Sequence, residues 1–134
     1  MNHHGRLALG VTALLASSAC SASCSDQSPE RAAIPWGRIH SPEARQRGRD
    51  LYFRYCVLCH GEHADGRGAR SMGLDRTPAD FTKPDWSSAG AAARAYHAIR
   101  QGVPGTPMPS WSALSEEESW DLVAFLVSVN KQGV

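Results

Sequence analysis

The sequence lacks a long hydrophobic run, an excess of charge of one sign and any pattern typical of β-strands. Its main apolar stretch, residues 7–16, is too short to span a bilayer comfortably. The chain has 14 Lys and Arg residues against 13 Asp and Glu residues, with no basic run, so a nucleic-acid-binding role is not indicated. It also has no Ser-His-Asp arrangement and no phosphate-binding glycine loop. We therefore do not expect an enzyme with a catalytic site of its own.

Residues 1–24 resemble an export signal, because a positively charged start is followed by the apolar stretch 7–16 and then by small residues. Two processing outcomes remain open. One is cleavage by signal peptidase after Ala19 or Ala22. The other is cleavage beside Cys20 with lipid attached to it, since SSAC resembles a bacterial lipobox. Both outcomes predict an extracytoplasmic protein of the bacterial periplasm, which in the second case is anchored to a membrane by the lipid.

The rest of the chain is expected to be a linker followed by one domain. Residues 25–40 are rich in Ser, Pro, Arg and Ala and lack periodicity, which predicts a flexible linker. Residues 41–134 have the length of a single small domain.

Three helices are predicted within this domain. The first begins at Ser41, a good N-cap, and the second covers about residues 88–101 and ends before Gly102. The third begins with a capping box formed by Ser115 and Glu118 and carries a broad apolar stripe. The segments between the helices are rich in glycine and proline and are predicted to be loops. The sequence thus predicts an all-α fold with long loops.

The first helix ends in the pattern Cys56-x-x-Cys59-His60, which is the attachment signature of c-type haem. Two thiols nearly one helical turn apart can each form a thioether with one of the two vinyl groups of haem. His60 is then directed at the iron as an axial ligand. A loop-rich chain of this length buries a modest core, and a covalently held apolar group would enlarge that core.

Three other roles of the cysteines were weighed. A redox-active disulfide would be expected near a βαβ pattern, which the sequence does not contain. A zinc site would need a second ligand pair, and the candidates His63 and His97 are scattered along the chain. A simple Cys56–Cys59 disulfide stays open as the alternative in an exported protein.

From residue 48 to the C-terminus the chain resembles the class I monohaem cytochromes c. More narrowly, it is similar to the small cytochrome c domains related to the third subunit of cbb3-type oxidases. The resemblance is carried by GRDLYFRYCVLCHGEHADGRG, RTPADFT, AIRQGVPGTPMPSW and LSEEESWDLVAFLVSV, in that order. It implies the cytochrome c fold, with three to four short helices and long loops wrapped around one covalently attached haem.

The resemblance assigns the sixth ligand of the iron to Met108. The residues support this assignment, because the prolines on both sides of Met108 stiffen the loop that would hold its thioether. Thioether ligation favours reduced iron and raises the reduction potential. Met72 is the competing methionine, and its alternative role is packing at the surface or at the haem edge.

Further roles come from the resemblance. In the family a proline carbonyl accepts a hydrogen bond from the iron-bound histidine, and Pro78 is the best match for that proline. Trp111 is expected near the haem, either as a hydrophobic lid or as an N–H donor to a propionate. Arg67 and Arg70 are candidate partners of the propionates. Gly48 is expected to let the first helix cross the last one closely, near Trp120, Val123 or Ala124.

The expected function is electron transfer. With His60 and Met108 both bound to iron no position is left for a substrate, and the expected partners are redox proteins, such as a terminal oxidase or a periplasmic dehydrogenase. Two alternatives remain: a haem-based sensor or peroxidase-like domain in which Met108 is displaced, and a cytochrome subunit of a larger oxidoreductase complex. Contact with a membrane is expected only through an N-terminal lipid.

Overall fold

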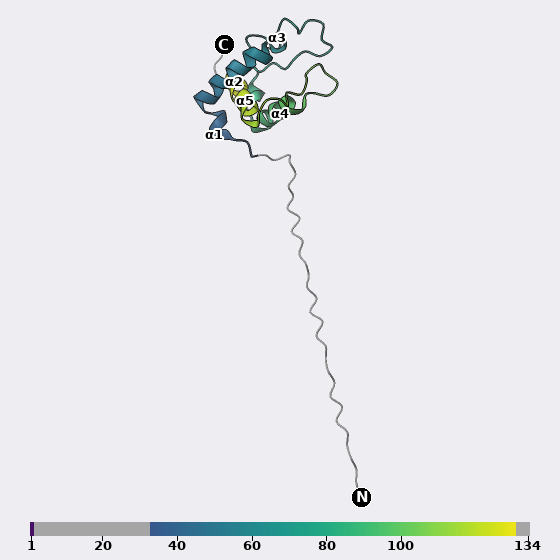
Figure 1. Ribbon diagram of the computed structural model, residues 1–134. Helices are drawn as coiled ribbons and strands as arrows, with labels where there is room; N and C mark the ends of the chain where they lie inside the picture. Colours follow the sequence, from purple (N-terminus) through teal and green to yellow (C-terminus); the bar gives the residue numbers. More distant parts are fainter. Residues whose placement is uncertain (2–32, 131–134) are drawn as a thin grey trace. The chain divides into compact units, whose positions relative to one another are not determined.

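The fold is given by a computed structural model, which describes Met1 and residues 33–130. Within residues 33–130 there are five α-helices and one 3₁₀ turn, and there are no strands. They are α1 (Trp36–Ile39), α2 (Pro42–Tyr55), α3 (Val57–His60), the turn η2 (Pro84–Ser87), α4 (Ala89–Gln101) and α5 (Glu116–Val129). The three long helices are the predicted ones, and Figure 1 shows them gathered with the loops extending from one side. The predicted all-α class is confirmed.

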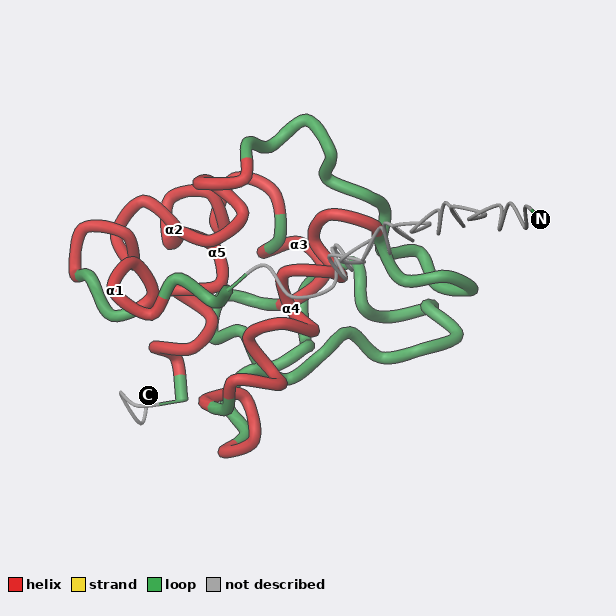
Figure 2. The backbone as a smooth tube through the Cα atoms, turned by 90° about the horizontal axis from the view of Figure 1, so that it is seen from below, coloured by secondary structure: helices red, strands yellow, loops and turns green. Residues whose placement is uncertain are grey.

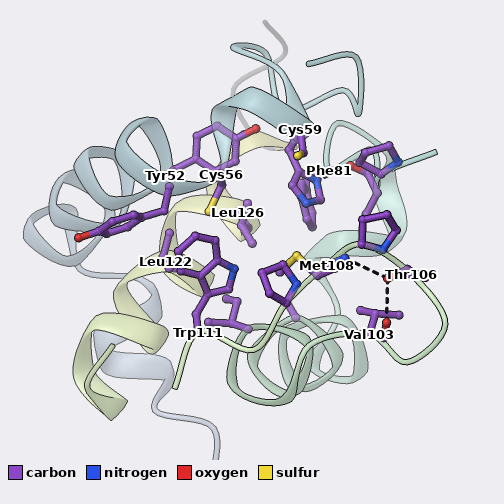
Figure 3. Close-up of a pocket in the computed structure, with 18 of the residues that line it drawn as sticks. Tyr52, Cys56, Cys59, Phe81, Val103, Thr106, Met108, Trp111, Leu122 and Leu126 are labelled. Atoms are coloured by element: carbon purple, nitrogen blue, oxygen red, sulfur yellow. Dashed lines mark hydrogen bonds between the residues drawn. The ribbon is translucent and has the colours of Figure 1, made fainter. Parts of the chain in front are cut away.

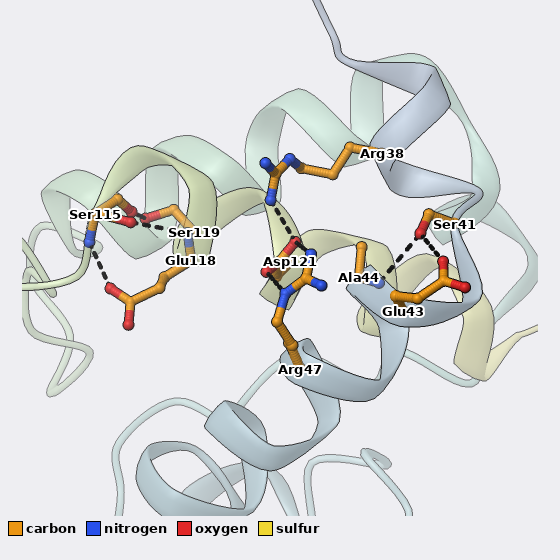
Figure 4. Close-up of polar contacts among 9 residues, drawn as sticks. All are labelled: Arg38, Ser41, Glu43, Ala44, Arg47, Ser115, Glu118, Ser119 and Asp121. Atoms are coloured by element: carbon orange, nitrogen blue, oxygen red, sulfur yellow. Dashed lines mark hydrogen bonds and ion pairs between the residues drawn. The ribbon is translucent and has the colours of Figure 1, made fainter.

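The caps of the long helices follow the sequence pattern. The Ser41 hydroxyl accepts a hydrogen bond from the amide of Ala44 at 3.3 Å, at the start of α2. Both bonds of the predicted capping box are present at the start of α5. The Glu118 amide donates to the Ser115 hydroxyl at 3.1 Å, and the Ser115 amide donates to the Glu118 carboxylate at 2.8 Å (Figure 4). Local chemistry therefore decides where these helices begin.

Helices α2 and α5 cross at close range, and the ribbon of Figure 1 and the backbone tube of Figure 2 both show them side by side. The contact is closest at Gly48, where an added Cβ would lie 1.8 Å from the carbonyl oxygen of Asp121 and 3.0 Å from the amide nitrogen of Leu122. The sequence predicted a crossing near Trp120, Val123 or Ala124. The structure places it between them, at Asp121 and Leu122. Tyr52 and Val123 are fully buried beside it, and this crossing is the centre of the core.

The linker predicted over residues 25–40 ends sooner than expected, because the structure makes its last residues part of the domain. Residues 36–39 form α1, and Ile39 is only 1% exposed. The guanidinium of Arg38 donates to the Asp121 carboxylate at 2.8 Å (Figure 4). The sequence pattern missed this because four residues are too few to show helical periodicity. Residues 25–32, and residues 2–24 of the export signal predicted over 1–24, lie outside the described part.

Asp121 is a buried carboxylate on α5 that joins three helices. It is 3% exposed and accepts hydrogen bonds from Arg38 of α1 and from Arg47 of α2, the latter at 2.6 Å from Nε (Figure 4). Burying a carboxylate costs free energy unless it is paired, and here two cations compensate that cost. None of the helices in the described part is long and apolar enough to cross a membrane.

Candidate functional site

A pocket of about 390 Å³ lies between α2, α3, α4, α5 and the loops that join them. Its walls are mainly apolar, and Leu122 and Leu126 of α5 form part of them. All six residues predicted for the site line this one pocket: Cys56, Cys59, His60, Pro78, Met108 and Trp111. Figure 3 shows the two cysteines on one side of the pocket and Met108 and Trp111 on the other. The structure thus brings together residues that are up to 55 positions apart in the chain (111 − 56 = 55).

The two cysteines lie at the junction of α2 and α3. Cys56 is the residue between the two helices, and Cys59 lies in α3. Both thiols are free. Burial raises the pKa of the Cys56 thiol to about 12, and the nearby Cys59 adds to the shift, so the neutral thiol is strongly favoured near pH 7. The structure therefore holds two unpaired thiols, rather than a disulfide, against the pocket.

His60 ends α3 with its ring oriented by the backbone. Its Nδ1 lies 3.2 Å from the carbonyl oxygen of Ala79, and because a carbonyl can only accept, Nδ1 carries the proton and Nε2 is left as the acceptor. Burial lowers the pKa of His60, which favours the neutral ring, and the bond to Ala79 opposes that shift only in part. The sequence predicted that the carbonyl of Pro78 would accept this hydrogen bond, and this prediction was wrong by one residue. Pro78 itself lines the pocket.

The turn after His60 is held by a side chain of α2. The hydroxyl of Tyr52 is buried and donates to the carbonyl oxygen of Gly61 at 2.6 Å. Burial raises the pKa of Tyr52, so the hydroxyl keeps its proton as a donor. Gly68 then passes so close to α3 that an added Cβ would lie 2.4 Å from the Leu58 carbonyl oxygen. The glycines after the cysteine motif therefore let the loop fold back against α3.

The loop that carries Met108 is fastened to the end of α4. The Val103 amide donates to the carbonyl of Met108 at 3.1 Å, and the Trp111 amide donates to the carbonyl of Ile99 at 2.8 Å. The Met108 amide donates to the Thr106 hydroxyl at 3.2 Å (Figure 3). The two prolines beside Met108 and these bonds leave its backbone little freedom. The thioether is therefore presented to the pocket by a stiff loop.

The competing residues lie elsewhere. Met72 is 89% exposed and does not line the pocket, and His63 is also exposed. Arg67 and Arg70, the candidate partners of the propionates, are exposed and lie outside the pocket lining. The arginine that does line the pocket is Arg76, and no sequence pattern distinguished it from its neighbours.

His97 does not line the pocket either, and its ring packs against that of Tyr96 at 5.9 Å between centroids. In the part of the chain that the structure describes, no group of three or more His, Cys, Asp or Glu residues could hold a metal ion by itself. The zinc alternative therefore finds no ligand set among these residues.

The residues of the pocket fit a covalently held haem. Two free thiols stand one turn apart, and an imidazole beside them has its Nε2 free. A thioether and an apolar wall complete the lining. Thiols, imidazole and thioether are the groups that attach haem c and ligate its iron. The fold and this set of donors define a c-type cytochrome domain.

The chain belongs to the family described as cytochrome c oxidase, cbb3-type, subunit III, which it matches over residues 43–126. Among solved structures it is similar to a chain of the Kuenenia stuttgartiensis reducing HAO-like protein complex, with 26% sequence identity and a TM-score of 0.60. That match covers 67% of this chain and 45% of the other, so the similarity reaches less than half of the neighbour's length. No curated protein matches. The family implies covalently bound haem c and a role in haem-based electron transfer.

Proposed function

We propose that the protein is an extracytoplasmic electron carrier with one covalent haem, held by thioethers from Cys56 and Cys59 and ligated by His60 and Met108. The observation that carries this proposal is the meeting of these four side chains in one apolar pocket. When bound, the haem supplies the iron whose ferric and ferrous states hold and release the electron. If His60 and Met108 both held the iron of a bound haem, no position on that iron would be left for a substrate.

The chain's own residues prepare the pocket for this role. The bond to Ala79 fixes the ring of His60 and leaves Nε2 free to act as a ligand. The stiff loop presents the Met108 sulfur from the other side. The wall of the pocket is mainly apolar, and a less polar surrounding favours the form of the iron with lower charge, the ferrous form. Together with the thioether these features favour a raised reduction potential.

The proposed partners are redox proteins that donate and accept electrons. The solved neighbour belongs to a protein complex, which supports a place for this domain in a larger assembly. The proposed location, the bacterial periplasm, rests on the export-signal pattern of residues 1–24. A lipid on Cys20 would tether the domain to a membrane, and simple cleavage would leave it free.

Exchange of Met108 for alanine tests the ligand set. The full chain, produced with a cytochrome c maturation system, should give a c-type absorption spectrum and a methionine-to-iron charge-transfer band when oxidised. Met108→Ala should keep the haem, lose that band, lower the reduction potential and bind carbon monoxide when reduced, because the sixth position opens. The measurements are absorption spectra of both redox states and a redox titration.

Met72→Ala is the matched control, because it removes an exposed methionine outside the pocket. It should leave spectrum, potential and carbon monoxide response unchanged. If Met72→Ala lost the band and Met108→Ala kept it, the assignment of the sixth ligand would be overturned. A reduced wild-type protein that binds carbon monoxide readily would instead indicate the ligand-sensing alternative.

A further inference from the structure

The indole nitrogen of Trp111 is a buried donor without a partner. Among residues 33–130 it is the only buried side-chain nitrogen or oxygen that makes no hydrogen bond. Trp111 lines the pocket, and its ring packs against that of Tyr55 with 5.3 Å between centroids. A buried N–H that stays unpaired costs about 1–3 kcal/mol. We therefore expect the indole N–H of Trp111 to have an acceptor in the functional protein.

A propionate cannot reach the nitrogen while the indole keeps its position in the structure. The nitrogen is already covered by protein atoms, so that no water-sized atom can touch it. A carboxylate oxygen at hydrogen-bonding distance would need the same space as a water oxygen. The role of Trp111 as a donor to a propionate, expected from the sequence, would therefore require the indole to turn away from Tyr55. No protein acceptor, sulfur included, bonds the nitrogen as the side chains stand, so a neighbouring side chain must turn to bring an acceptor to it.

The position of the indole points to the Met108 loop. In Figure 3 the nitrogen lies on the side of the ring that faces Met108. The carbonyls of this loop region already accept hydrogen bonds, those of Met108 and Ile99 from amides and that of Arg100 from the Ser110 hydroxyl at 2.7 Å. The thioether of Met108 is a further acceptor on this side, a weak one, and the three rotatable bonds of its side chain let the sulfur turn toward the indole.

We propose that Trp111 is a positioning residue that donates a hydrogen bond to the sulfur of Met108 when this sulfur ligates the iron. The inference rests on the proposed function, since it assumes that Met108 is the sixth ligand. Both residues are fastened through their backbones to the end of α4, so the two backbones stay close together and rotation of the Met108 side chain alone can bring the sulfur toward the indole. The bond draws electron density from the sulfur and holds it in place. It thereby raises the reduction potential and keeps other ligands away from the iron.

The test is Trp111→Phe in the full haem-loaded protein. Phenylalanine keeps an aromatic ring against Tyr55 and removes the N–H. We expect the haem and the methionine-to-iron band to remain, and the potential to fall. Binding of carbon monoxide to the reduced protein should strengthen by about two- to tenfold, the range that a hydrogen bond of ordinary net strength gives. Trp36→Phe is the matched control, because Trp36 lies in α1, outside the pocket lining, and it should change none of these quantities.

A second measurement needs no change at Trp111. Hydrogen exchange of the Trp111 indole N–H, followed by NMR on the reduced protein, should be slow in the wild type and at least severalfold faster in Met108→Ala. Equal exchange in both proteins would overturn the proposal. A Trp111→Phe protein with unchanged potential and unchanged carbon monoxide binding would overturn it as well. If the substitution changed only the pH dependence of the potential, the acceptor would be a carboxylate, and the proposal would again be overturned. If the wild type lacks the methionine-to-iron band, the ligand assignment itself fails, and that failure is distinct from these.

Discussion

At the scale of single residues, Gly48 shows how strictly one position can be determined by its neighbour. It has an ordinary helical conformation, so backbone strain does not require glycine there. The requirement comes from α5, whose Asp121 carbonyl oxygen lies 1.8 Å from the place of a Cβ. The neighbour is backbone in the middle of a helix, which cannot move aside as the end of a side chain can. Gly48 costs α2 some helix stability and permits the closest contact of the core.

Gly48→Ala should therefore lower the free energy of unfolding by about 3 kcal/mol or more, because α2 and α5 must separate to admit the methyl group. Thermal or denaturant unfolding of the haem-loaded protein measures this change. Gly37→Ala is the control, since nothing lies within 4 Å of a Cβ at that exposed position in α1. It should leave stability unchanged or raise it by up to about 1 kcal/mol. Equal effects of the two variants would mean that the crossing is looser than described.

At the scale of elements, the short helix α1 belongs to the domain because α5 and α2 hold it. Ile39 is buried in the core, and Arg38 pairs with the buried carboxylate of Asp121 at 2.8 Å. A helix of four residues has almost no stability of its own. Its structure therefore depends on these long-range contacts, and the contacts in turn complete the surface of α5.

Deletion of residues 33–39 should destabilise the haem-loaded protein by about 2–5 kcal/mol, the usual cost of removing one buried aliphatic side chain such as Ile39. His40 and Ser41 remain in this variant, so the cap of α2 is kept. Deletion of residues 25–32, which shortens the predicted linker, should leave the unfolding midpoint unchanged. Should the two deletions behave alike, α1 would be part of the linker, as the sequence first suggested.

At the scale of the whole molecule, the pocket joins every long helix and two separate loops. Its thiols and imidazole come from residues 56–60, its second sulfur from residue 108 and part of its apolar wall from α5. A domain that surrounds so much apolar space gains its full core only with the pocket filled. Attachment of the haem is therefore expected to be coupled to the final packing of the domain.

The intact mass of the protein isolated from bacterial cells tests the mature molecule as a whole. We expect a chain that has lost its first 19 to 22 residues, the positions of the predicted cleavage, and that carries one covalent haem. Added mass of a lipid on Cys20 would establish the tethered form, and its absence the free form. A chain that still begins at Met1 would contradict the periplasmic location, and a chain without haem would contradict the function. A double variant, Cys56→Ser with Cys59→Ser, should have no covalent haem and serves as the reference mass.

The sequence by itself determined the features that depend on neighbouring residues. The starts of α2 and α5 follow from Ser41 and Ser115, because a capping side chain bonds an amide only two or three positions away. The cysteine pair and His60 are close in sequence and therefore close in space. The family resemblance added Met108, which spacing alone could not have linked to His60.

Only the tertiary structure decided which distant groups meet. The carbonyl facing His60 is that of Ala79 rather than of Pro78, because the path of the loop, and not the presence of a proline, sets the distance. Packing likewise brings Arg38 to the carboxylate of Asp121. It also covers the indole nitrogen of Trp111 and leaves it without a partner. Such contacts depend on where the helices cross and on the path by which each loop comes back to them. A loop that is longer or shorter by one residue brings a different group into contact. No local pattern in the sequence encodes that geometry.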